Sequence, residues 1–233
     1  MTPVFSEILA EFSTPDAVAV AWLFLCFATL SRVVGQKSGK RASTETLMSR
    51  YRELWVEQMI TRQPRIFDAS ILATLRQGTA FFASGCMIAI GGAAALLGQP
   101  DRLQSIAGNI DQSLKASPLV WEAKLFTVVF FLVIGFLRFV WAHRVFGYCG
   151  IVMAAVPNEP EDPTCQTMSR RAAKLANTAS RSFNSGLRAI YFALASLGWF
   201  VSPWVLFATT LLTVFILLRR EFASQTRAAL LEE

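Results

Sequence analysis

The side chains that could do chemistry are few, and the single histidine, His143, limits the possibilities most. One histidine cannot ligate a haem through two imidazoles or build a His-rich metal site. A Ser–His pair would need a hydroxyl about 3 Å from the imidazole, and the residues around Ser84 match no nucleophile elbow. We therefore predict no catalytic residue, no metal ligand, no cofactor and no enzymatic activity.

Phosphate-binding motifs and intramembrane carboxylates are also missing from the sequence. Gly91-Gly92 and the stretch 147–150 form neither a P-loop nor a dinucleotide-binding motif. The long apolar stretches carry Asp16 and Glu122 only at their ends, whereas carboxylates at membrane depth are the usual relays for protons and cations. ATP-driven work and coupled proton or cation transport are therefore not expected.

Four basic side chains remain as candidates for contact with an ion or a head group: Arg138, His143, Arg144 and Arg188. All four fall near the predicted inner boundary of the membrane. Basic groups at the inner mouth of a pore would favour anions. Alternatively, these side chains contact lipid head groups or pair with Glu57 and Asp68.

Four long apolar runs must position these residues, and they cover 16–35, 78–98, 121–144 and 189–218. Each is about 20 residues or longer, enough to cross a hydrocarbon core of about 30 Å as a helix. Hydrophobic residues make up 54% of the chain, and the mean hydropathy is +0.44. Because lipid offers no hydrogen bonds to the backbone, we predict one all-α membrane domain over 1–233, a bundle of four transmembrane helices plus interfacial amphipathic helices.

The distribution of basic residues predicts the orientation. Segments 32–76 and 138–188 hold nine and seven of the 22 Lys and Arg residues, whereas 102–124 and 219–227 hold three each. Because cytoplasmic loops are enriched in basic residues, we predict a multi-pass protein of the bacterial inner membrane with both termini in the periplasm. The net charge of +6 suits anionic head groups, and no nucleic-acid-binding module is visible.

The last apolar run is interrupted by Ser202 and Pro203. Because proline lacks a backbone donor and bends helices, we predict one kinked helix over 189–218. Alternatively, the run forms a re-entrant pair, which would return the C-terminal tail to the cytoplasm.

Amphipathic patterns lie between the apolar runs. Cytoplasmic amphipathic segments are predicted at 43–77 and 164–188, and an outer interfacial helix at 101–117. Ser43 or Thr44 should cap the first of these helices, which should end before Pro64. Their apolar faces would lie on the inner leaflet or pack under the bundle.

Small residues recur in the second run as Gly85, Ala89 and Ala93. Such a four-residue spacing lets another helix backbone approach closely. The face would pack inside one chain or between the chains of a homo-oligomer.

A spaced set of residues resembles a known family. The set comprises Arg50-x-Arg52-x-x-Trp55, Met59-x-x-Arg62-x-x-Arg65-Ile66-x-Asp68, Phe81-Phe82-Ala83-Ser84 and the later Trp199, Arg219-Arg220-Glu221 and Ser224. It is similar to a family of uncharacterised bacterial multi-span membrane proteins, domain of unknown function number 599. The resemblance implies a multi-span inner-membrane protein and supplies no activity, cofactor or catalytic residue.

Two functions fit these patterns. The first is a channel-like or transporter-like homo-oligomer with a slight preference for anions. The alternative is an accessory or scaffold subunit that docks a partner membrane complex through its amphipathic helices and basic cytoplasmic face. In both cases the bilayer, with its anionic head groups, is a partner.

Overall fold

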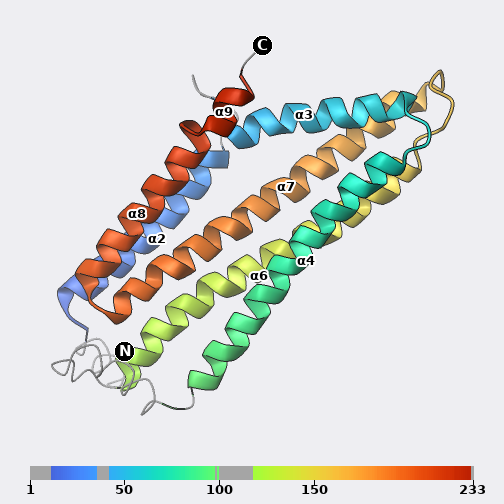
Figure 1. Ribbon diagram of the computed structural model, residues 1–233. Coiled ribbons are helices and arrows are strands. Elements are labelled where there is room, and N and C mark those ends of the chain that lie inside the picture. Colours follow the sequence, from blue (N-terminus) through green and yellow to red (C-terminus); the bar gives the residue numbers. More distant parts are fainter. Residues whose placement is uncertain (1–11, 36–41, 98, 100–117, 232–233) are drawn as a thin grey trace, which may run out of the picture. The chain divides into compact units, whose positions relative to one another are not determined.

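The computed structural model describes residues 12–35, 42–97, 99 and 118–231, and every regular element in these ranges is a helix. The elements are α2 (Thr14–Gly35), α3 (Thr44–Gln58), η1 (Met59–Thr61), α4 (Ile66–Leu97), α6 (Pro118–Ala154), α7 (Thr164–Ser196), η2 (Leu197–Phe200), α8 (Pro203–Phe222) and α9 (Gln225–Ala229) (Figure 1). The predicted all-α class is confirmed. The predicted outer helix at 101–117 lies outside the described residues.

Among the described residues, three helices are long and apolar enough to cross a membrane, where four spans were predicted. These stretches are Thr14–Val34, Ile66–Leu97 and Leu119–Ala154. The second and third are longer than the predicted 78–98 and 121–144. The reason is that α4 and α6 continue without a break past Gly78 and Arg144, as 32-residue and 37-residue helices.

The chain divides into two compact units. Unit 1 comprises 1–33, 86–135 and 187–217, and unit 2 comprises 34–85, 136–186 and 218–233. The long helices contribute a segment to each unit. Unit 2 carries 17 of the 22 Lys and Arg residues of the sequence.

Local sequence signals explain the ends of α3. Ser43 caps the helix, because its hydroxyl oxygen accepts a hydrogen bond from the backbone N–H of Thr46 at 3.2 Å. The helical stretch ends at Thr61, before Pro64. Proline disfavours helical geometry in the residue that precedes it, so both predicted ends are confirmed.

Unit 1 contains a tight reversal of the chain between α7 and α8. The Thr209 hydroxyl of α8 donates a hydrogen bond to the Ala195 carbonyl of α7 at 2.8 Å. In one straight helix, residues 14 apart would lie about 21 Å from each other. The prediction of one kinked helix over 189–218 is therefore wrong, because α7 ends at Ser196 and α8 starts afresh at Pro203 (Figure 1).

Two features of the sequence allow this reversal. Pro203 is the first residue of α8, where its missing N–H and fixed φ fit a helix start. Gly198 in the connecting turn lies against α8, since a Cβ placed there would come 2.6 Å from the Thr209 hydroxyl. A larger residue at this position would push the two helices apart.

The interior of unit 1 is rich in aromatic rings. Phe131 of α6 is fully buried. Its ring centroid lies 5.3 Å from that of Phe24, 5.1 Å from that of Phe27 and 6.0 Å from that of Phe192. These separations are typical of favourable aromatic pairs, so Phe131 ties α6 to both α2 and α7.

The interior of unit 2 combines small side chains of α7 with bulkier side chains of the other helices. Ala172, Ala173, Ala176 and Ala179 give α7 an alanine face against bulkier residues of α3, η1, α4 and α6. The bulkier members are Val56, Met59, Ile60, Leu72, Val145, Phe146, Cys149 and Met153. The alanine face of α7 and part of the apolar face of α3 therefore pack within the protein, one of the two predicted locations, whereas Tyr51 and Leu54 of α3 are about half exposed.

The start of α3 contacts the end of α8 and α9 inside unit 2. The Thr44 hydroxyl donates to the Glu221 carbonyl at 3.1 Å, and the Arg227 guanidinium donates to the Ala42 carbonyl at 3.0 Å. Residues 42–45 and 221–227 therefore lie together. The predicted arrangement, with 43–77 on one side of the membrane and the C-terminal tail on the other, does not fit these contacts.

Candidate functional site

The four basic residues predicted to share an inner mouth do not converge. Arg138 and Arg144 are exposed, and the Arg144 guanidinium binds the Tyr148 hydroxyl one turn further along α6. Because an α-helix advances about 100° per residue, the side chains at 138, 143 and 144 point at least about 100° apart. Arg188 is buried and belongs to unit 1, whereas the other three belong to unit 2.

His143 is held between α6 and α4. Its Nδ1 lies 3.1 Å from the Thr79 hydroxyl and 3.3 Å from the Arg76 carbonyl, and its Nε2 lies 3.3 Å from the Arg76 guanidinium. The Thr79 hydroxyl in turn donates to the Arg76 carbonyl at 2.6 Å. This set fits a ring whose Nδ1 donates and whose Nε2 accepts. The single histidine therefore positions the Arg76 side chain.

The predicted helix-packing and kink residues also differ from expectation. Gly85 and Ala89 are exposed, and a Cβ added at Gly85 would meet no atom within 4 Å. Only Ala93 is buried, against Trp121 and Leu125. Ser202 and Pro203 form the start of α8, where the Ser202 hydroxyl accepts from the Val205 N–H at 3.2 Å.

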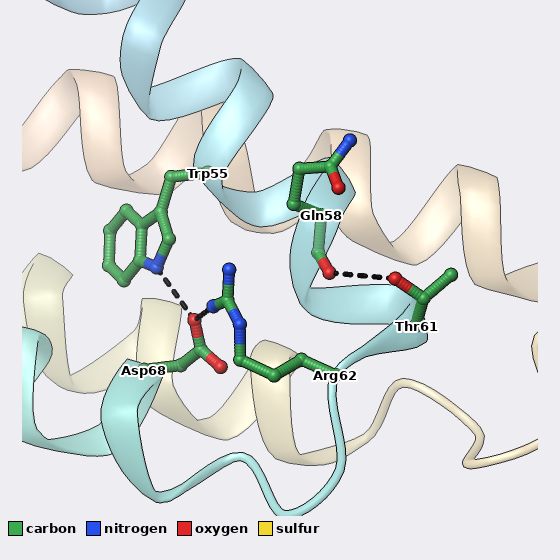
Figure 2. Close-up of polar contacts among 5 residues, drawn as sticks. All are labelled: Trp55, Gln58, Thr61, Arg62 and Asp68. Atoms are coloured by element: carbon green, nitrogen blue, oxygen red, sulfur yellow. Dashed lines mark hydrogen bonds and ion pairs between the residues drawn. The ribbon is translucent and has the colours of Figure 1, made fainter.

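A buried carboxylate forms the centre of a polar cluster in unit 2. Asp68, in the first turn of α4, is 1% exposed. Its Oδ1 accepts a hydrogen bond from the Trp55 indole at 2.8 Å and an ion-paired one from Arg62 (Figure 2). Because a buried charge is tolerated only when it is paired and hydrogen-bonded, the two donors fix the connection between α3 and α4.

The same connection is clamped to the loop that precedes α7. The Arg65 guanidinium donates to the carbonyls of Val156 at 2.6 Å and Pro157 at 2.7 Å, and the Gln63 amide donates to the Asn158 carbonyl at 3.0 Å. Trp55, Met59, Arg62, Arg65 and Asp68 all belong to the spaced set that carries the family resemblance. The structure brings these residues together around one connection.

A wide polar cavity lies between α3 and α7. Its volume is about 590 Å³. Four cationic and two carboxylate side chains line it, namely Arg50, Arg52, Lys174, Arg181, Glu45 and Glu53. A second cavity of about 340 Å³ adjoins it and shares the Glu53 and Lys174 walls. We call the two cavities together the α3–α7 groove.

Asn177 organises the floor of this groove. Its side-chain oxygen accepts from the Arg52 guanidinium at 2.9 Å, and its nitrogen donates to the Glu53 carboxylate at 3.1 Å. Burial lowers the pKa of Arg52, the nearby Glu45 opposes that shift, and Arg181 adds to it. Arg52 is thus a fixed structural cation, whereas Arg50, Lys174 and Arg181 are exposed.

Unit 1 buries one cation that the sequence patterns did not mark. Lys124 is 5% exposed, with its Nζ 4.6 Å from the Trp121 ring and 5.9 Å from the Trp199 ring. The Trp199 indole donates to the Asp16 carboxylate at 2.7 Å. Two aromatic faces and a carboxylate nearby make this burial tolerable. The cluster joins α2, α6 and the turn before α8.

Sequence reasoning also missed the role of Asp68 and Asn177. Asp68 was considered only as a partner for basic residues at the membrane boundary, and Asn177 was not singled out. The spacing of Trp55, Arg62 and Asp68 within the resemblance set was the available signal for the first. Asn177 lies more than a hundred residues from Arg52 in the chain, so no local pattern could have revealed it.

The structure offers no obvious place for a metal ion within its described ranges. There, no three His, Cys, Asp or Glu side chains gather closely enough to hold one. The four cysteines, all within those ranges, are free and buried. What the arrangement can do chemically is bind anionic or polar groups at the α3–α7 groove.

Comparison with known proteins places the chain in a family. No curated protein and no solved structure matches it. The family model described as "Protein of unknown function, DUF599" matches residues 18–226, which is most of the chain. The long apolar helices of the chain are consistent with a membrane protein. The chain therefore belongs to the DUF599 family.

Proposed function

We propose that this chain is a non-enzymatic inner-membrane protein that docks an acidic segment of a partner protein in its α3–α7 groove. This is the accessory or scaffold function predicted above. The docking surface is now the α3–α7 groove instead of the apolar faces of the amphipathic helices. The observation that carries it is the exposed set of Arg50, Lys174 and Arg181 around a cavity of about 590 Å³. The alanine face of α7 and part of the apolar face of α3 pack inside unit 2, and the charged groove between the two helices is the surface that suits an acidic partner.

The reversal at α7 and α8 supports a cytoplasmic position for the groove. With the C-terminal tail on the side of residues 42–45, 19 of the 22 basic residues fall in segments on that side, and three fall in 102–124. Because basic residues mark cytoplasmic loops, unit 2 is on the cytoplasmic side and the N-terminus is periplasmic. The C-terminus is then cytoplasmic.

A place in the bilayer for α8 is part of this proposal. The helix has 20 residues, about 30 Å in length. Trp204, Leu211, Leu212 and Phe215 are each more than half exposed on it. Such a continuous apolar surface is costly in water and favourable in lipid. The end of α7 and α8 would then form a hairpin in the membrane.

The channel-like function has less support. Arg138, His143 and Arg144 point in different directions, Gly85 and Ala89 are exposed, and Pro203 starts a helix. A homo-oligomer remains a prediction, and the exposed part of α4 would be its contact. Flux of an anion through liposomes that contain the purified chain would favour this function over docking.

A site-directed cross-linking experiment tests the docking proposal. A photoreactive amino acid at Thr178, which lines the groove, should capture a partner in native membranes. The same amino acid at the exposed Thr74 of α4 is the matched control and should capture none. Reversal of two groove charges by Arg50→Glu with Arg181→Glu should abolish capture and stoichiometric co-purification, and high salt should weaken both.

The control for charge reversal is Arg138→Glu with Arg144→Glu, which changes two exposed arginines of α6 outside the groove. That variant should keep the partner. Equal capture from Thr178 and Thr74 would contradict the proposal. So would a partner that survives the Arg50 and Arg181 reversal, or a clean homo-oligomer without any second protein.

A further inference from the structure

A separate cavity of about 280 Å³ lies in unit 2 where α4 passes α6. Leu72 and Met153 give it apolar walls, and Gly150 brings the α6 backbone close, since a Cβ there would come 2.8 Å from Leu72. Three charged residues interrupt this apolar lining: Asp68 and Arg65 at the start of α4, and Arg76 three turns further along. None of these three residues lines the α3–α7 groove.

Two polar atoms of these lining residues have no hydrogen-bond partner within the described part of the chain. Asp68 Oδ1 is saturated by Trp55 and Arg62, but Oδ2 is buried and unpartnered. Both terminal nitrogens of Arg65 bind backbone carbonyls, whereas its Nε is buried and unpartnered. Buried polar groups are paired in the great majority of cases, and an exception calls for a missing partner. Two residues of the cavity wall thus each carry a buried polar atom that lacks a partner, one acceptor and one donor, which a bound molecule that reached them could satisfy.

We propose that this cavity binds the head group and upper acyl region of one membrane phospholipid that carries a primary amine. The ammonium group would donate to Asp68 Oδ2, and the phosphate would accept from Arg65 Nε and from Arg76. A zwitterionic aminophosphate supplies both missing partners in one molecule. The apolar parts of the lipid would lie on Leu72 and Met153.

Three observations favour a lipid over a free anion. The lining is mostly apolar, which a small phosphate would leave empty. Both walls belong to helices that are long and apolar enough to cross a membrane. The Arg76 side chain is exposed and is steadied by His143 at 3.3 Å, so it can reach a phosphate at the lipid surface.

Native mass spectrometry of the full chain in mild detergent tests the proposal. The probes are phosphatidylethanolamine and phosphatidylcholine with the same acyl chains. We expect one retained phosphatidylethanolamine, bound about tenfold more tightly than phosphatidylcholine, since a trimethylated ammonium cannot donate a hydrogen bond to Asp68. Arg76→Gln should weaken both lipids about tenfold, because it removes the charge that binds the phosphate.

Two matched tryptophan substitutions test the cavity without changing the Asp68 cluster. Ala73 lines the cavity and is exposed, so Ala73→Trp should fill it and remove the retained lipid. Thr74→Trp, on the next residue outside the cavity, should keep the lipid. Equal retention of the two lipids by the unmodified chain would overturn the proposal, as would equal retention by the two tryptophan variants. Loss of the protein partner in the Arg50 and Arg181 variant leaves these results unchanged, because those residues lie outside this cavity.

Discussion

The two units hold their helices together by partly different physical means. Unit 1 relies on large rings such as Phe131, which contacts four other phenylalanines, its neighbour Phe130 among them. Unit 2 also holds a cluster of rings, Phe82, Phe139 and Phe183, and adds to it the alanine face of α7 and the ion pair of Asp68 with Arg62. Close packing of rings is thus common to both units, whereas the alanine face distinguishes unit 2.

The largest expected effect tests the aromatic packing of unit 1. Phe131→Ala should lower the free energy of unfolding by about 3 kcal/mol, because a fully buried ring leaves a cavity. Phe130→Ala, at a neighbour that is about half exposed, is the control and should cost much less. Thermal unfolding of the purified chain in detergent would measure both variants. An equal loss of stability in the two variants would show that the buried Phe131 ring stabilises unit 1 no more than its half-exposed neighbour does.

The next effect tests the charged cluster of unit 2. Asp68→Ala should cost about 2 kcal/mol, because it leaves the Trp55 indole and the partly exposed Arg62 without their acceptor. The exposed Glu57→Ala is the matched control and should change stability little. If Asp68→Ala unfolds at the same temperature as the unmodified chain, the cluster does not hold α3 to α4.

A smaller effect on stability is expected at a glycine that lies against another helix, in comparison with a glycine that has space around it. Gly198→Ala should cost about 1–2 kcal/mol, because the new methyl group would overlap Thr209 and the Val205 carbonyl. Gly91→Ala, also in unit 1, meets no atom within 4 Å and should be neutral or slightly stabilising. Comparison of the two melting temperatures checks the turn between α7 and α8, and a tolerated Gly198→Ala would argue against it.

The hydrogen bonds of Asn177 in the α3–α7 groove should contribute less to the free energy of unfolding than the Gly198 contact does. Asn177→Ala removes hydrogen bonds to Arg52 and Glu53 and should cost about 1 kcal/mol. Thr178→Ala, which changes the next groove residue, should have a smaller effect. An Asn177→Ala variant as stable as Thr178→Ala would mean that Asn177 does not order the groove.

The smallest effect is a dependence on pH at the start of α7. The Thr164 N–H and hydroxyl donate to the Asp162 carboxylate at 2.7 and 2.6 Å and lower the pKa of Asp162. Because the folded-state pKa lies below the unfolded value, this contribution is present above pH about 4 and is lost as the pH falls through the folded-state pKa. The stability difference between the unmodified chain and Asp162→Asn should therefore shrink below pH 4. A constant difference would contradict this assignment.

Local sequence rules predicted the helices well and the long-range contacts poorly. Ser43 and Pro64 mark the ends of the α3 region because capping and proline geometry act over a few residues. The reversal at α7 and α8 was stated only as the alternative to a kinked helix, because it depends on Gly198 fitting against Thr209, which a helix pattern does not reveal. Among the candidate site residues, His143 does contact another helix, but to position Arg76 rather than to line a shared mouth.

The small-residue face shows the same limit. Gly85, Ala89 and Ala93 have one spacing, yet only Ala93 has a neighbour that buries it. A period predicts that residues share a side of a helix, but not what covers that side. The Asp68 cluster likewise joins residues whose local roles are unremarkable. It becomes visible only when the connection between α3 and α4 is folded.

A reporter fused after Glu233 tests the central claim most directly, namely that the reversal between α7 and α8 returns the C-terminal tail to the cytoplasm beside α3. A green fluorescent protein at this position should fluoresce, because it folds in the cytoplasm, and an alkaline phosphatase at the same position should be inactive. An active phosphatase with a dark fluorescent fusion would place the tail in the periplasm and contradict the account.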